Sequence, residues 1–130
     1  MTHTEQVGLW GEKHAEKHLK RKKYRILGRR VRLGKRDEID LVARQGKTLV
    51  FVEVKTRKSE AFGRPVAAVG REKRRVMSRA AVRYLRERDF PKIHFRFDVV
   101  EVIGELDDKK PNIRVIENAF TLDKRYQLPY

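Results

Sequence analysis

The sequence predicts an α/β fold in which two helices pack on a mixed central β-sheet, in the order α-β-β-β-α-β-β. Three observations support this. Two segments carry apolar residues at helical spacing, five shorter segments favour strands, and no repeat or linker divides the 130 residues. A chain of this length forms one domain with a modest core. We expect that domain to span residues 1–120, followed by a tail at 121–130.

The first half of the chain predicts one helix and three strands. The helix is expected at about 5–22, because Gly11, Ala15 and Leu19 recur every four residues. A first strand follows from about Tyr24 to Leu33 and ends in a turn at Gly34 and Lys35. Two further strands are expected at about 37–43 and 48–56, joined through Gln45–Gly46.

The second half predicts a helix and two more strands. Gly63-Arg64-Pro65 interrupts the pattern, and a helix follows at about 66–88 with an apolar stripe of Val69, Val76, Ala80 and Tyr84, backed by Met77, Ala81 and Leu85. Lys73 lies on that stripe, which is unusual for a lysine. Strands are expected at 93–103 and 113–116. Periodicity leaves open whether the helices cover one face of the sheet or both.

Charge and composition restrict the function. Lys and Arg number 33 against 18 acids, giving a formal charge of +15, which favours nucleic acid as a partner and an anionic membrane less. The absence of cysteine excludes disulfides and thiolate chemistry. His14 and His18 lack the glutamate of a zinc-protease helix and are expected on a solvated face. The chain has no apolar run of roughly 18 residues, so no membrane segment is expected. We expect a cytoplasmic location.

The two central strands carry charged residues inside apolar runs. A tight hairpin at Gln45–Gly46 would place Glu38 opposite Glu53, and Asp40 opposite Phe51 and diagonal to Glu53. Alternation then puts one set of side chains on one face: Glu38, Asp40, Glu53 and Lys55. The other face receives Ile39, Leu41, Val52 and Val54. Unpaired charges are costly to bury, so this cluster predicts either a site or a network of ion pairs.

Such a cluster suits a divalent metal. Mg²⁺ and Mn²⁺ prefer carboxylate, carbonyl and water oxygens, and they activate water for phosphodiester hydrolysis. Asp40 and Glu53, about 7–8 Å apart at their Cα atoms if diagonal, could share an ion, with the Val54 carbonyl as a further ligand. Lys55 could orient water or stabilise phosphate, and Glu12 could complete the shell. Glu38 could be either an outer ligand or a residue that holds the ligands in place. The alternative is an ion-pair cluster without metal.

Asp40, Glu53 and Lys55, in Glu-Ile-Asp-Leu-Val-Ala and Phe-Val-Glu-Val-Lys-Thr-Arg, resemble the PD-(D/E)xK nuclease superfamily. More closely, the chain resembles the YraN family of small bacterial proteins, which are similar to archaeal Holliday-junction resolvases. The resemblance extends to about Phe120 and includes four further segments: residues 8–15, Phe62-Gly63, Lys73 and Arg96-Phe-Asp-Val-Val100. Two positions depart from the pattern, with Ile39 in place of proline and Asp37 in place of glycine.

The resemblance implies a restriction-endonuclease-like core with helices on both sides of the sheet. It also implies that Asp40, Glu53 and Glu12 bind Mg²⁺ or Mn²⁺ and that Lys55 is the catalytic lysine. Glu38 and Lys73 match positions without a settled role. Asp98 is either a further acid near the site or a structural partner of Arg96, the second being favoured. For nucleic-acid binding, the expected residues are Arg57, Lys73, Arg74 and Arg75.

Three functions remain open at the level of sequence. The first is a metal-dependent endonuclease acting on DNA, with branched or damaged DNA among its candidate substrates. The second is a non-catalytic nucleic-acid-binding protein with a nuclease-like fold, and the third, based on charge alone, is a ribosomal-RNA-binding protein. DNA is favoured over RNA. A homodimer would suit symmetric incision of a junction. The tail could cover the core or a partner subunit.

Overall fold

The computed structural model describes residues 1–58 and 69–129. Its elements, in chain order, are α1 (His3–Arg21), β1 (Arg25–Leu33), β2 (Asp37–Gln45), β3 (Thr48–Arg57), α2 (Arg71–Arg86), β4 (His94–Ile103) and β5 (Asn112–Phe120). The predicted α/β class and the order α-β-β-β-α-β-β are therefore confirmed. The predicted break at 63–65, the Phe62-Gly63 motif and the first three residues of the predicted second helix lie outside the described residues.

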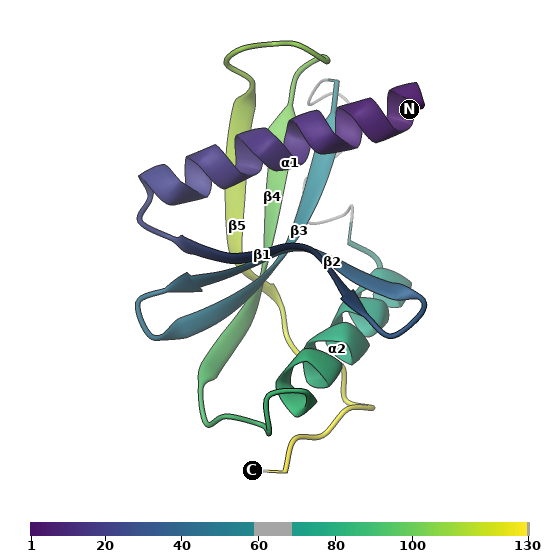
Figure 1. Ribbon diagram of the computed structural model, residues 1–130, viewed down its shortest axis with the longest axis vertical. Helices are drawn as coiled ribbons and strands as arrows, with labels where there is room; N and C mark the ends of the chain where they lie inside the picture. Colours follow the sequence, from purple (N-terminus) through teal and green to yellow (C-terminus); the bar gives the residue numbers. More distant parts are fainter. Residues whose placement is uncertain (59–68, 130) are drawn as a thin grey trace.

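All five strands form one mixed sheet in the order β1-β2-β3-β4-β5. Neighbouring strands are antiparallel except β3 and β4, which run parallel. Parallel neighbours cannot be joined by a tight turn, and α2 lies in the connection between these two (Figure 1). Helix α1 crosses the sheet in front of β3, β4 and β5 in that view.

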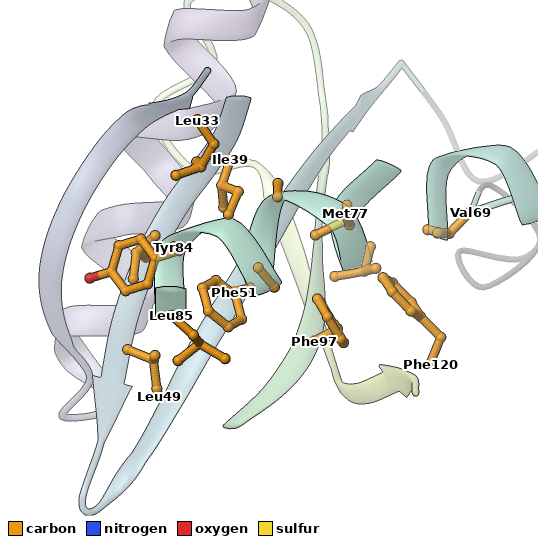
Figure 2. Close-up of a cluster of buried hydrophobic side chains, with 14 residues drawn as sticks. Leu33, Ile39, Leu49, Phe51, Val69, Met77, Tyr84, Leu85, Phe97 and Phe120 are labelled. Carbon is orange, nitrogen blue, oxygen red and sulfur yellow. The ribbon is translucent and has the colours of Figure 1, made fainter. Parts of the chain in front are cut away.

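The two helices cover opposite faces of the sheet. We call the cluster that contains Phe51, Phe97 and α2 residues such as Leu85 the α2-side core (Figure 2). The cluster that contains Val50, Val52 and α1 residues such as Leu19 is the α1-side core. Because successive strand residues point to opposite faces, the alternation of Val50, Phe51 and Val52 between the cores settles the arrangement that periodicity left open.

Helix α1 packs closely on β3. Its N-terminus is capped by Thr2, whose Oγ1 accepts a hydrogen bond from the Glu5 N–H at 3.1 Å. A Cβ atom on Gly11 would lie 2.1 Å from Cγ2 of Thr56 on β3, so only glycine allows this approach without a shift. The buried residues of α1 are the predicted stripe of Gly11, Ala15 and Leu19.

The described part of helix α2 begins later than predicted and buries nearly the expected residues. Gly70 is its N-cap in extended conformation, and Met77, Ser78, Ala80, Ala81, Tyr84 and Leu85 are buried. Among the described residues, no helix combines the length and apolar character that crossing a bilayer requires.

Strand β5 is longer than the sequence predicted, and the tail that follows it packs on the core. Pairing of β5 with β4 continues to Phe120, which lies opposite Phe97, whereas alternation predicted a strand of 113–116 only. Beyond it, Leu122 and Leu128 pack against the α2-side core. The main-chain N–H of Asp123 donates to Oγ of Ser78 on α2 at 2.9 Å. The tail was expected to cover either the core or a partner subunit. In the structure, it packs on the chain's own core.

Candidate metal and phosphodiester site

The candidate site lies where β2 and β3 stop pairing. Their ladder runs from Gln45 opposite Thr48 to Leu41 opposite Val52. At the next position, Oδ2 of Asp40 accepts a hydrogen bond from the main-chain N–H of Val54 at 2.8 Å. This carboxylate therefore takes the place of a strand partner and lies between the two strands.

The predicted hairpin register is wrong. Gly46 and Lys47 form the two-residue turn, so Glu38 does not face Glu53 and Asp40 does not face Phe51. The reason is the backbone of Gly46, whose φ of +59° suits the first position of a two-residue hairpin turn. The slip is two residues, so each β3 side chain keeps its predicted face. It also brings Asp40 to the level of Glu53.

The predicted face of Ile39 is also wrong. Ile39 packs in the α2-side core, as Figure 2 shows, whereas Leu41 packs in the α1-side core. The alternation of β2 is therefore broken at Asp40, between these two residues. Across from Asp40, the alternation of β1 is broken as well, at Arg30, whose φ is +45°.

Glu38 consequently leaves the predicted cluster. The Asp37 carboxylate accepts hydrogen bonds from Arg79 of α2 at 2.7 and 2.8 Å, and Ile39 packs on the same side. Glu38, between them in an extended strand, therefore projects from the α1 side. Its side chain is 42 % exposed, and its Oε2 lies 4.0 Å from Nε of Arg32.

Glu53 is the buried acid of the site and is held by two lysines. The residue is 5 % exposed, and it lies on the α2 side of β3, two residues after Phe51. Its Oε1 is 3.3 Å from Nζ of Lys55, and its Oε2 is 3.4 Å from Nζ of Lys73 on α2. The lysine that stood out on the apolar stripe of the second helix thus reaches the candidate site.

Asp40 and Glu53 interact strongly. Burial raises the pKa of Asp40 to about 7, and the Glu53 carboxylate is the next largest cause, with a smaller contribution from Glu12. The hydrogen bond from Val54 and the charge of Lys73 act in the opposite direction and are outweighed. At neutral pH, a substantial fraction of the Asp40 carboxyl groups therefore keeps the proton.

Glu12 is engaged elsewhere. Its two carboxylate oxygens accept hydrogen bonds from Nε and Nη2 of Arg30, at 2.8 and 3.3 Å. Arg30 projects toward α1 because of its positive φ, together with Arg29, which pairs with Glu16. Within residues 1–58 and 69–129, no three histidine, aspartate or glutamate side chains gather closely enough to hold a metal.

Comparison with known proteins places the chain in a family. Residues 11–102 match the uncharacterised protein family UPF0102. A UPF0102 protein of Geobacter sulfurreducens is 43 % identical over 120 residues, which cover 92 % of each chain. A UPF0102 protein of Chlorobaculum tepidum is 44 % identical over 118 residues, covering 88 % of this chain and 91 % of the relative. The chain belongs to the UPF0102 family. This is the YraN family that the sequence motifs resembled.

A further buried carboxylate of this UPF0102 protein, on the same face as Glu53, was not predicted. Glu101 on β4 is 1 % exposed and lies beside Lys55 in the parallel ladder. Its Oε2 is 3.2 Å from Nε of Arg57. Glu101 follows Val99 of the α2-side core by two residues, so it shares a face with Glu53 and Lys55. An acid at the centre of the apolar run 99–103 was the available signal.

Asp98 belongs to a buried polar network of this UPF0102 fold. The residue is fully buried, and Oδ1 accepts hydrogen bonds from Nε of Arg96 at 2.9 Å and from the main-chain N–H of Asn118 at 3.0 Å. Arg96 also donates to the Tyr24 hydroxyl at 2.9 Å. Burial and the Asp98 charge raise the pKa of Tyr24. Asp98 thus pairs with Arg96, as expected if its role is structural.

Two of the arginines expected to bind nucleic acid make local contacts in the UPF0102 structure. Nε of Arg74 donates to the main-chain oxygen of Val69 at 3.0 Å, and Arg75 pairs with Glu72 one turn earlier. The other two expected residues, Arg57 and Lys73, lie on the face that carries Glu53.

Proposed function

We propose that this UPF0102 protein is a metal-dependent endonuclease that hydrolyses phosphodiester bonds in DNA. One observation carries the proposal: the half-buried Asp40 lies near the buried Glu53, and desolvation followed by the Glu53 charge raises the pKa of Asp40 to about 7. Two carboxylates that repel each other in a half-dry site are stabilised by a divalent cation between them. The formal charge of +15 supports a polyanionic substrate.

The donor set fits Mg²⁺ or Mn²⁺. Magnesium sites in phosphate-processing proteins often use only one or two carboxylates, with water and substrate oxygens completing the shell. Asp40 and Glu53 would supply the carboxylates, and the Val54 carbonyl a further oxygen. Glu12 would join only after exchanging its bonds to Arg30. A bound ion would supply Lewis-acid stabilisation of the phosphoryl group and would lower the pKa of a bound water.

The cations around Glu53 have roles that follow from their positions. Lys55, whose side chain is 31 % exposed, is near enough to Glu53 to orient a water, and free enough to donate to a phosphate oxygen. Lys73 approaches the other oxygen of Glu53 and places a second positive charge beside that carboxylate. Arg57, held against Glu101, adds a planar donor for phosphate on the same face.

The sequence resemblance narrows the substrate. The spacing of Asp40, Glu53 and Lys55 resembles the PD-(D/E)xK nucleases, and the chain as a whole is similar to archaeal Holliday-junction resolvases. We therefore propose DNA rather than RNA, with branched or damaged DNA as the first substrates to examine. A homodimer would place two such sites for symmetric incision of a junction.

A cleavage assay tests the proposal. Purified protein is mixed with Mg²⁺ or Mn²⁺ and with linear, nicked, flapped and four-way-junction DNA. We expect cleavage by the native chain, loss of cleavage in Asp40→Ala and Lys55→Ala, and retention in Glu87→Ala and Lys92→Ala, which alter exposed residues. Cleavage that persists in the Asp40 or Lys55 variant would contradict the assignment of the site.

A non-catalytic nucleic-acid-binding protein is the second candidate. It is favoured by the ion pairs that already neutralise the acids, since Glu53 has two lysines and Glu12 has Arg30. This alternative predicts salt-sensitive binding without cleavage under any metal. It also predicts that Mn²⁺ gives no heat of binding and no rise in melting temperature, which separates the two candidates.

A further inference from the structure

A basic groove lies on the side of the sheet opposite the candidate site. It runs between α1 and the connection from β4 to β5, which Figure 1 shows at the end of the sheet that α1 crosses. Helix α1 contributes His14, Lys17, His18 and Arg21 to its walls, and the connection contributes Lys109 and Lys110. The cavity volume is about 810 Å³.

The groove exists because α1 has two different flanks. On one flank, Glu12 and Glu16 pair with arginines of β1. On the other, Trp10, His14, His18 and Arg21 follow one another at helical spacing. Nε1 of Trp10 donates to the main-chain oxygen of Asp108 at 3.1 Å, so the β4–β5 connection is fixed beside this second flank.

The charge in the groove is of one sign. Five lysine and arginine side chains and two histidines line it, and among the described residues no carboxylate does. Lys20, one of the five, also pairs with Glu16 at 2.8 Å. Burial, followed by the charges of neighbouring lysines and Arg21, lowers the pKa of both His14 and His18. Neutral imidazoles beside lysines leave a positive, partly dry surface with hydrogen-bonding groups, which suits phosphate oxygens.

We propose that this groove binds the sugar-phosphate backbone of a nucleic-acid strand. From His14 to Arg21 the helix rises about 10 Å, which is long enough for the row to lie beside neighbouring phosphates of one strand. Lys109 and Lys110 line the same groove from the other wall. The inference does not depend on metal binding or cleavage at Asp40 and Glu53.

A nucleic acid fits the groove better than a membrane surface does. Peripheral membrane binding relies on large apolar side chains that enter the lipid beside the basic ones. The large apolar side chains that are exposed in the described residues are Met1, Leu9 and Leu27, and none of them lines the groove.

Binding of DNA by charge-reversed variants tests the proposal. Lys109→Glu/Lys110→Glu is compared with Lys47→Glu/Lys92→Glu, which makes the same change in net charge at exposed positions outside the groove. The probe is a fluorescent single strand of about 20 nucleotides, in chelator so that no metal contributes. Circular dichroism melting checks that each variant is folded.

We expect the groove variant to bind at least about 10-fold more weakly, and its plot of log K against log salt to be shallower by about two. The control should remain within about 3-fold of the native chain. In the native chain, the ring proton signals of His14 and His18 should shift when DNA is added.

Equal losses in both double variants would overturn the proposal, because net charge alone would then explain binding. Unchanged binding in the groove variant, or histidine signals that do not move, would overturn it too. The last measurement compares binding of the native chain and the groove variant to anionic phosphatidylserine vesicles. If the groove variant lost vesicle binding and kept DNA binding, the ligand would be a lipid surface instead.

Discussion

Replacing Asp40 by asparagine should make the metal-free protein more stable at alkaline pH. The folded chain holds this carboxyl at a pKa of about 7, above its ordinary value of 3.8, because of burial and Glu53. Asparagine keeps an oxygen that can accept the hydrogen bond from Val54, and it removes the charge that the site disfavours. The native chain should lose stability as Asp40 ionises with rising pH, and the variant should not.

The sign and size follow from proton linkage. Between pH 3.8 and about 7, the folded chain holds a proton on Asp40 that the unfolded chain has released, so stability falls as pH rises. Each pH unit in this interval is worth about 1.4 kcal/mol, which gives about 4 kcal/mol in total as an upper value for a partly exposed group. Above about pH 7 the contribution levels off.

Thermal unfolding in chelator, from about pH 4 to about pH 8, measures this effect. The melting temperature of Asp40→Asn should rise relative to the native chain by up to about 15 °C across that interval. Asp107→Asn, at an exposed carboxyl, is the matched control and should show a much smaller change. A difference between Asp40→Asn and the native chain that stays constant with pH would refute the reasoning.

Three further changes test other contacts. Lys73→Met should raise the Asp40 pKa further, because the ammonium now lowers it, and carboxyl-carbon NMR titration would show this. Asp98→Asn should cost about 3 kcal/mol in denaturant unfolding, because it removes the fully buried charge that pairs with the half-buried Arg96 and leaves only Glu117, 3.7 Å away, as a counter-charge. Gly11→Ala should cost about 1–3 kcal/mol by forcing α1 off the sheet. Gly8→Ala, whose added Cβ would have its nearest neighbour at 3.8 Å, should not destabilise.

The order of elements could be predicted because local patterns determine it. The stripe of Gly11, Ala15 and Leu19 is the buried face of α1, and alternation identified β2, β3 and β4. Strand β5 was predicted too short. Its last residues are held by pairing with β4 and by the bond from Asn118 to Asp98, and neither long-range contact leaves a periodic signal.

The site could be predicted in part. Lys73 stood out as a lysine on an apolar stripe, and it does reach Glu53. The face of Glu38 could not be predicted, because the broken alternation at Asp40 depends on a side chain replacing a strand partner. Glu12 was expected beside the other acids. Its pairing with Arg30 depends on a positive φ that the sequence does not signal for an arginine.

Calorimetric titration of Mn²⁺ into the metal-free native chain and into Asp40→Asn tests the metal site most directly. We expect binding to the native chain that strengthens as pH rises through about 7, where Asp40 loses its proton, and binding at least about 10-fold weaker in the variant. Equal heats from the two proteins, or no heat from the native chain up to millimolar Mn²⁺, would contradict a metal site at Asp40 and Glu53.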